Sequence, residues 1–65
     1  MIKSVIRLQN DIVMVFNTEG KHMPEYQGRY EEVKGSILRD VLSKAVFARR
    51  FSYDTELETV FREEW

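Results

Sequence analysis

The sequence contains no cysteine, a single histidine and a single proline. The lack of cysteine excludes disulfide bonds, and one histidine leaves a four-ligand structural zinc site without its usual ligands. A chain of 65 residues buries only about 60% of the surface that its unfolded form exposes, so its stability is marginal. Since the usual crosslinks are excluded, we expect oligomerisation to supply the missing stabilisation.

The sequence also lacks a long hydrophobic run. No stretch approaches the roughly 20 apolar residues of a membrane span, and the first residues lack the longer apolar region of a signal peptide. We therefore expect a soluble, cytoplasmic protein. The apolar content of 43% argues against disorder, and no repeat, low-complexity segment or linker interrupts the chain. These features predict one compact domain over residues 1–65.

Charge is balanced in total but not along the chain. The net charge is −1, yet residues 1–50 carry nine Lys or Arg against six acids, whereas residues 54–65 carry one Arg against five acids. Such an asymmetry is typical of a basic nucleic-acid surface with an acidic flap, or of two halves that pair with each other or with a neighbouring subunit.

Two apolar, β-branched runs, at residues 2–8 and 12–16, predict an N-terminal β-hairpin. A two-residue turn at Asn10-Asp11 would place Leu8 opposite Val13 and Ile6 opposite Val15, with Arg7 opposite Met14 and Val5 opposite Phe16. A turn shifted to Gln9-Asn10 keeps the same parity. The inner face of this hairpin would carry Ile2, Ile6, Leu8, Val13 and Val15. The second face would carry Val5, Ile12, Met14 and Phe16.

The second face of the hairpin is the predicted partner-binding surface, because the run 12–16 is apolar at every position and a short chain has little else to cover it. Met14 and Phe16 would be its anchors. Trp65 is a further candidate. An exposed Trp lowers solubility, so we expect its side chain to be buried. Burial against this domain is favoured, and burial against another subunit is the alternative.

The middle of the chain changes its period at Tyr30. Before it, residues 17–29 are polar and turn-rich, and they fit either a tight turn with a short edge strand at 21–23 that stops at Pro24, or an irregular binding loop. After it, apolar residues recur at spacings of three and four, which predicts an amphipathic helix whose stripe docks on the inner face of the hairpin. That stripe is Tyr30, Val33, Ile37, Leu38, Val41, Leu42 and Ala45.

Two further segments complete the predicted α+β fold. Alternation over residues 46–53 favours another strand of the same antiparallel sheet over an extension of the helix to about Phe51. Residues 54–65 have Asp54 as an N-cap and helical spacing of apolar residues, which favours a short C-terminal helix; a strand over 57–61 is the alternative. The expected architecture is a small antiparallel sheet, the hairpin plus at least one strand, packed on one amphipathic helix.

No residue pattern indicates catalysis, a metal or a cofactor. His22 is the only imidazole and has only Glu19 and Glu25 nearby, so it is interpreted as a surface side chain. Adjacent acids such as Glu31-Glu32 point to different sides of a helix, and no glycine-rich phosphate loop occurs. We expect a protein that is not an enzyme.

A mixture of cations and aromatic rings is the one other candidate site. Such mixtures bind single-stranded nucleic acid on sheet surfaces. Its members would be Arg29, Arg49, Arg50, Phe51 and Tyr53. A pI near 5.8 argues against this alternative, because phosphate-binding domains are usually basic. The predicted function is therefore a non-enzymatic protein–protein interaction module, a homo-oligomer or an accessory subunit, regulator or inhibitor of a larger protein.

Overall fold

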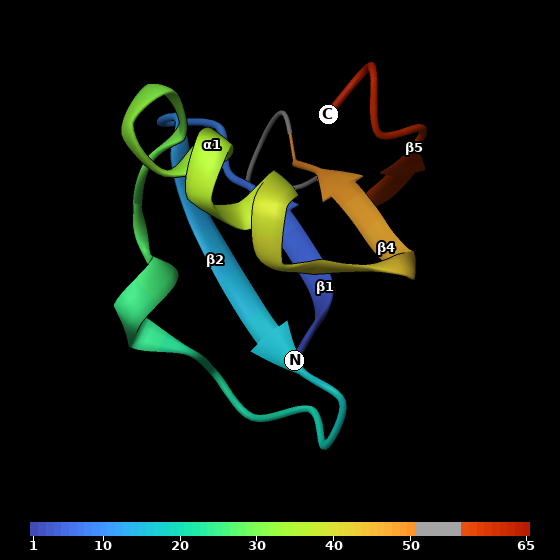
Figure 1. Ribbon diagram of the computed structural model, residues 1–65. Coiled ribbons are helices and arrows are strands. Elements are labelled where there is room, and N and C mark those ends of the chain that lie inside the picture. The colour runs from blue at the N-terminus through green and yellow to red at the C-terminus, as the bar shows by residue number, and fades with distance from the viewer. Residues whose placement is uncertain (51–56) are drawn as a thin grey trace.

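The computed structural model describes residues 1–50 and 57–65, and its fold is α+β (Figure 1). The elements are β1 (Ile2–Arg7), β2 (Ile12–Asn17), a 3-10 turn η1 (Pro24–Tyr26), β3 (Gly28–Arg29), α1 (Tyr30–Asp40), β4 (Val41–Arg49) and β5 (Glu58–Val60). The strands form one sheet in the order β3-β2-β1-β4-β5, and α1 lies across one of its faces (Figure 1). We call the face under α1 the inner face and the opposite one the outer face.

The sheet is mixed, whereas the prediction was an antiparallel one. β1 lies in the middle and pairs antiparallel with β2 but parallel with β4. This follows from the connection: β3 runs antiparallel to β2 and so in the same direction as β1 and β4, and α1 provides the crossover from β3 to β4. The sheet is also larger than the predicted minimum, since β3 and β5 add a short strand at each edge.

The N-terminal hairpin is confirmed, but its predicted register is wrong by one residue. Asp11 adopts the left-handed conformation (φ 64°), its N–H donates to the Leu8 carbonyl at 3.0 Å, and the Leu8 N–H donates to the Ile12 carbonyl at 2.8 Å. The connection thus spans three residues, a common hairpin loop in which the last residue is left-handed. Asp tolerates this conformation better than most residues, and its carboxylate also accepts a hydrogen bond from the Arg7 guanidinium.

The three-residue loop changes which side chains share a face. Val5 pairs with Val15 and Ile6 with Met14, so each residue of β1 is opposite a different partner from the one predicted. A slip of one residue exchanges the faces of a strand, because side chains alternate. Val5 therefore lies in the core with Val15, and Ile6 lies on the outer face.

The core lies between α1 and the inner face. Its buried members are Ile2, Val5, Val13, Val15, Ile37, Phe47 and Trp65. Five come from the three central strands, Ile37 comes from α1, and Trp65 comes from the end of the chain. The sheet and the helix alone therefore do not close this core, and the C-terminal segment completes it.

The helix is confirmed but ends at Asp40, before the predicted Ala45. Val41 begins β4 and pairs with Ile2, and after an irregularity Val46 pairs with Ser4. The β-branched residues at this point favour a strand, and pairing with β1 supplies the backbone hydrogen bonds that a longer helix would otherwise provide. The predicted strand at 46–53 is confirmed as far as Arg49, while Phe51 and Tyr53 lie outside the described residues.

The connection from β2 to α1 contains the predicted tight turn, with a single bridge in place of the predicted edge strand. Asn17 and Gly20 (φ 80°) close a tight turn through a 3.0 Å backbone hydrogen bond, and His22 then forms a single bridge with Phe16. Pro24 ends this return and starts η1. The strand β3, which follows and pairs with β2, was not predicted.

The predicted C-terminal helix is wrong for residues 57–65. Glu58–Val60 form β5 against β4, which matches the alternative strand, and a turn after Phe61 carries the chain back to Trp65. The β-branched Thr59 and Val60 suit this pairing. Asp54, the proposed N-cap, lies outside the described residues.

Trp65 is packed against its own domain, as the favoured prediction held. Its ring contacts those of Tyr30 and Phe47 edge-on, at centroid distances of 5.0 and 5.1 Å. The Tyr30 hydroxyl also donates to the Trp65 carbonyl at 2.8 Å. Trp65 is only 2% exposed, so it belongs to the core and is not available as a partner-binding residue.

Candidate interaction surface

The outer face presents a row of apolar side chains that the core does not use. Cross-strand pairs place Met14 beside Ile6, and Phe16 and Val46 on either side of Ser4. Ile12 extends the row on β2. We define the outer patch as Ile6, Ile12, Met14, Phe16 and Val46.

The outer patch is separate from the core in its packing. None of its five residues is among the hydrophobic side chains buried in the core or packed against it. Val46 is 43% exposed, and the other four are partly exposed. A cluster of this kind marks a surface that another molecule could cover.

Four of the five predicted partner-binding residues can now be compared with this patch. Ile12, Met14 and Phe16 belong to it, whereas Val5 is fully buried (0% exposed) on the inner face. Val5 was misplaced because the register was taken from a two-residue turn. Ile6 takes its place on the outer face, and Val46 joins from β4, whose pairing with β1 was not predicted.

The border of the outer patch is basic or neutral in the described strand pairs. Arg29 lies opposite Ile12 at the β3 edge, and Thr59 lies opposite Ala48 toward the β5 edge. His22 contacts the Phe16 ring at a centroid distance of 5.7 Å. No acidic side chain takes part in the outer-face pairs that the structure describes. A molecule that covers the patch therefore needs no cation to pair with a carboxylate there.

The predicted basic and aromatic site is only partly assembled. Arg49 lies opposite Arg7 in the register of β1 and β4, and the Arg50 N–H donates to the Arg7 carbonyl at 3.0 Å. The Arg7 guanidinium stacks 3.7 Å from the centre of the Tyr30 ring, a residue that the prediction did not include. Arg29 lies on the other face of the sheet, as its pairing with Ile12 shows, and the two predicted rings are outside the described residues.

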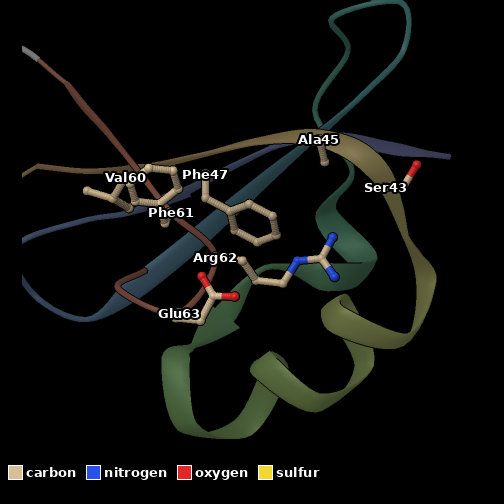
Figure 2. A pocket seen from close by; sticks show the side chains of 7 residues that line it. All are labelled: Ser43, Ala45, Phe47, Val60, Phe61, Arg62 and Glu63. Carbon is tan, nitrogen blue, oxygen red and sulfur yellow. The ribbon is translucent and has the colours of Figure 1, made fainter.

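A pocket of about 390 Å³ lies beside β4, where β5 ends (Figure 2). It is lined by Ser43, Ala45, Phe47, Val60, Phe61, Arg62 and Glu63. The Arg62 guanidinium carbon is 5.4 Å from the centre of the Phe47 ring, and Figure 2 shows this group turned toward Ser43 and away from the Glu63 carboxylate. The pocket thus combines an apolar floor with a cation at its mouth.

A side-chain hydrogen bond links η1, in the connection between β2 and α1, to the C-terminal end of α1. The Tyr26 hydroxyl donates to Asp40 Oδ2 at 2.8 Å, and this hydrogen bond raises the pKa of the Tyr26 phenol above its ordinary value. Asp40 also lies 3.6 Å from the Arg39 guanidinium. This group fixes the helix end and offers no nucleophile or metal ligand set.

In the part of the chain that the structure describes, no three His, Asp or Glu side chains gather to hold a metal ion. None of its described helices is long and apolar enough to cross a membrane. Comparison with protein families, with curated proteins and with solved structures finds no match to this chain.

Proposed function

We propose that this protein is a small, non-enzymatic protein–protein interaction module that assembles with a second copy of itself through the outer patch. The observation that carries this proposal is the apolar face of β1, β2 and β4, which the core leaves out. Two sheets can pack face to face about 10 Å apart with their apolar side chains between them. Such an assembly would act as an accessory subunit or regulator of a larger protein.

A second copy suits the outer patch for three reasons. It presents the same apolar surface, and a symmetric contact needs a patch that complements itself. The five residues of the patch are all uncharged, so no charge within the patch itself must be desolvated. The net charge of −1 gives two copies little mutual repulsion.

The test is the molar mass in solution of the wild type and of Met14→Glu. A carboxylate placed at Met14 would have to be desolvated in the contact, so the variant should have a lower mass at the same concentration. Ser36→Glu, which adds the same charge at an exposed position on α1, on the other side of the sheet from the patch, should keep the wild-type mass (Figure 1). A wild type that is monomeric at high concentration would refute the proposal.

Nucleic-acid binding is the second candidate, and the group of Arg7, Arg49 and Arg50 at the ends of β1 and β4 favours it. Binding through phosphate contacts would produce a gel shift that weakens with salt and that the double variant Arg49→Ala with Arg50→Ala abolishes. Absence of a shift at low salt would exclude it.

A further inference from the structure

The strand β5 forms one edge of the sheet, and no described strand pairs with its outer side. An edge strand presents a row of backbone N–H and C=O groups to solvent, where another strand can add. Edges are usually protected by inward charges, bulges or a covering segment. The three residues of β5 are Glu58, Thr59 and Val60, and the first two are exposed.

The side chains at the two ends of β5 are apolar and exposed. Leu57 is 48% exposed and Phe61 is 76% exposed, the highest value among the described large hydrophobic residues. Leu57 directly precedes β5 and Phe61 directly follows it, two residues on either side of Thr59. Phe61 also lines the pocket beside β4. Thr59 is opposite Ala48, so its side chain lies on the outer face.

We propose that two copies of the chain join through antiparallel pairing of their β5 edges, with the two-fold axis at Thr59. In this register Thr59 faces Thr59 of the second copy, Glu58 faces Val60, and Leu57 faces Phe61. The contact buries both exposed apolar side chains of each copy against one another. Directly opposed apolar and Thr–Thr pairs are favourable neighbours in antiparallel sheets.

Neighbouring registers are poorer. If the register shifted by one residue, outer-face side chains of one copy would lie opposite inner-face side chains of the other, because side chains alternate along a strand. An axis at Glu58 would bring two carboxylates face to face. An axis at Val60 would require pairing through Arg62, which already lies in the turn that leads to Trp65. The axis at Thr59 uses all three residues of β5.

Charges on the inner side of the β5 edge also complement each other. Glu58 and Arg62 flank Val60 on the side that faces Phe47. No described ion pair involves either side chain. With the axis at Thr59, Glu58 of the second copy is a diagonal neighbour of Arg62, at a spacing that long side chains span. Each copy therefore supplies the acid for the other copy's pocket cation.

This edge contact is different from the face-to-face contact proposed above, and it rests on that proposal only in taking the protein to self-associate. Both outer patches would lie on the same side of the joined sheet, since the axis at Thr59 keeps equivalent faces together. Two joined sheets could then pack through their outer patches, which gives a four-chain assembly. Each contact alone would give a two-chain assembly.

The edge contact is tested by disulfide formation in Thr59→Cys. The natural chain has no cysteine, so the new thiol is the sole reporter. Directly opposed residues of antiparallel strands have Cα atoms about 4.5 or 5.5 Å apart, and both values allow a disulfide. The control is Ser36→Cys, an exposed position on α1.

Under a mild oxidant, Thr59→Cys should form covalent dimers faster than Ser36→Cys by on the order of tenfold, since pairing raises the local thiol concentration. Adding Phe61→Lys, which alters an exposed side chain and spares the core, should remove most of this difference. Equal rates for the two cysteine variants would overturn the edge contact.

The outer patch is separated from the edge by adding Met14→Glu to Thr59→Cys. Rapid crosslinking should persist in this double variant, because the edge does not use Met14. If crosslinking persists but Met14→Glu does not lower the molar mass, the edge contact holds and the face-to-face contact fails. If Met14→Glu lowers the mass but the two cysteine variants crosslink equally slowly, the face-to-face contact holds and the edge contact fails.

Discussion

The two faces of the sheet have similar sequences but different surroundings. On β1, Val5 is fully buried while its neighbour Ile6 stays partly exposed, and on β2 the same holds for Val13 and Met14. The inner residues have α1 and the C-terminal Trp65 above them, whereas the five residues of the outer patch do not pack against that core. Apolar composition alone therefore does not identify the core. The length of the hairpin loop sets the strand register, and the register decides which residues the helix covers.

The largest expected effect tests whether Trp65 completes the inner face. Trp65→Ala should lower the free energy of unfolding by about 3–5 kcal/mol, because it leaves a cavity between Tyr30 and Phe47. Phe61→Ala, at a position that is exposed in the single chain, should change it by less than about 0.5 kcal/mol at protein concentrations where the chains are separate. Urea unfolding followed by circular dichroism gives both values. Equal losses would show that Trp65 is not part of the core.

The same substitution on each face sharpens the comparison. Val5→Thr should cost about 1–3 kcal/mol, because it places a hydroxyl among apolar side chains of the core. Val46→Thr, on the outer face, should cost much less at protein concentrations where the chains are separate, since its hydroxyl can then reach water. The fluorescence of the single Trp reports unfolding in both variants. A greater loss at Val46 would contradict the assignment of the faces.

The smallest expected effect concerns the residue that sets the register. Asp11→Ala should cost about 1 kcal/mol, because Ala tolerates the left-handed conformation poorly. Asp11→Gly removes the same carboxylate but accepts that conformation, so it should be the more stable variant. Thermal unfolding of the two variants makes this comparison. An Ala variant as stable as the Gly variant would argue against the three-residue loop.

The sequence predicted the fold class, the hairpin and the start of the helix because these depend on local periodicity. It did not predict the register, since Asn10-Asp11 fits a two-residue turn and a left-handed third residue is visible only in the dihedral angles. It did not predict the end of the helix either, because Val41 and Ala45 continue the helical spacing and only pairing with β1 favours β4.

The candidate surface was predicted in part for the same reason. Ile12, Met14 and Phe16 could be found because strand β2 is apolar at every position and one of its faces must lie outside the core. Ile6 and Val46 depend on pairing between strands that are distant in sequence. The β5 edge was not the favoured prediction, because the acidic residues and the helical spacing near the C-terminus favoured a helix. Pairing with β4 stabilises a strand there instead.

The central claim, that the outer patch holds two copies together, is tested most directly by the molar mass of the wild type and of Met14→Glu at high concentration, measured by light scattering. With both contacts formed, the wild type should have four times the chain mass of 7.8 kDa, and Met14→Glu should have half the wild-type value. A wild-type mass of a single chain, or a Met14→Glu mass equal to that of the wild type, would contradict it.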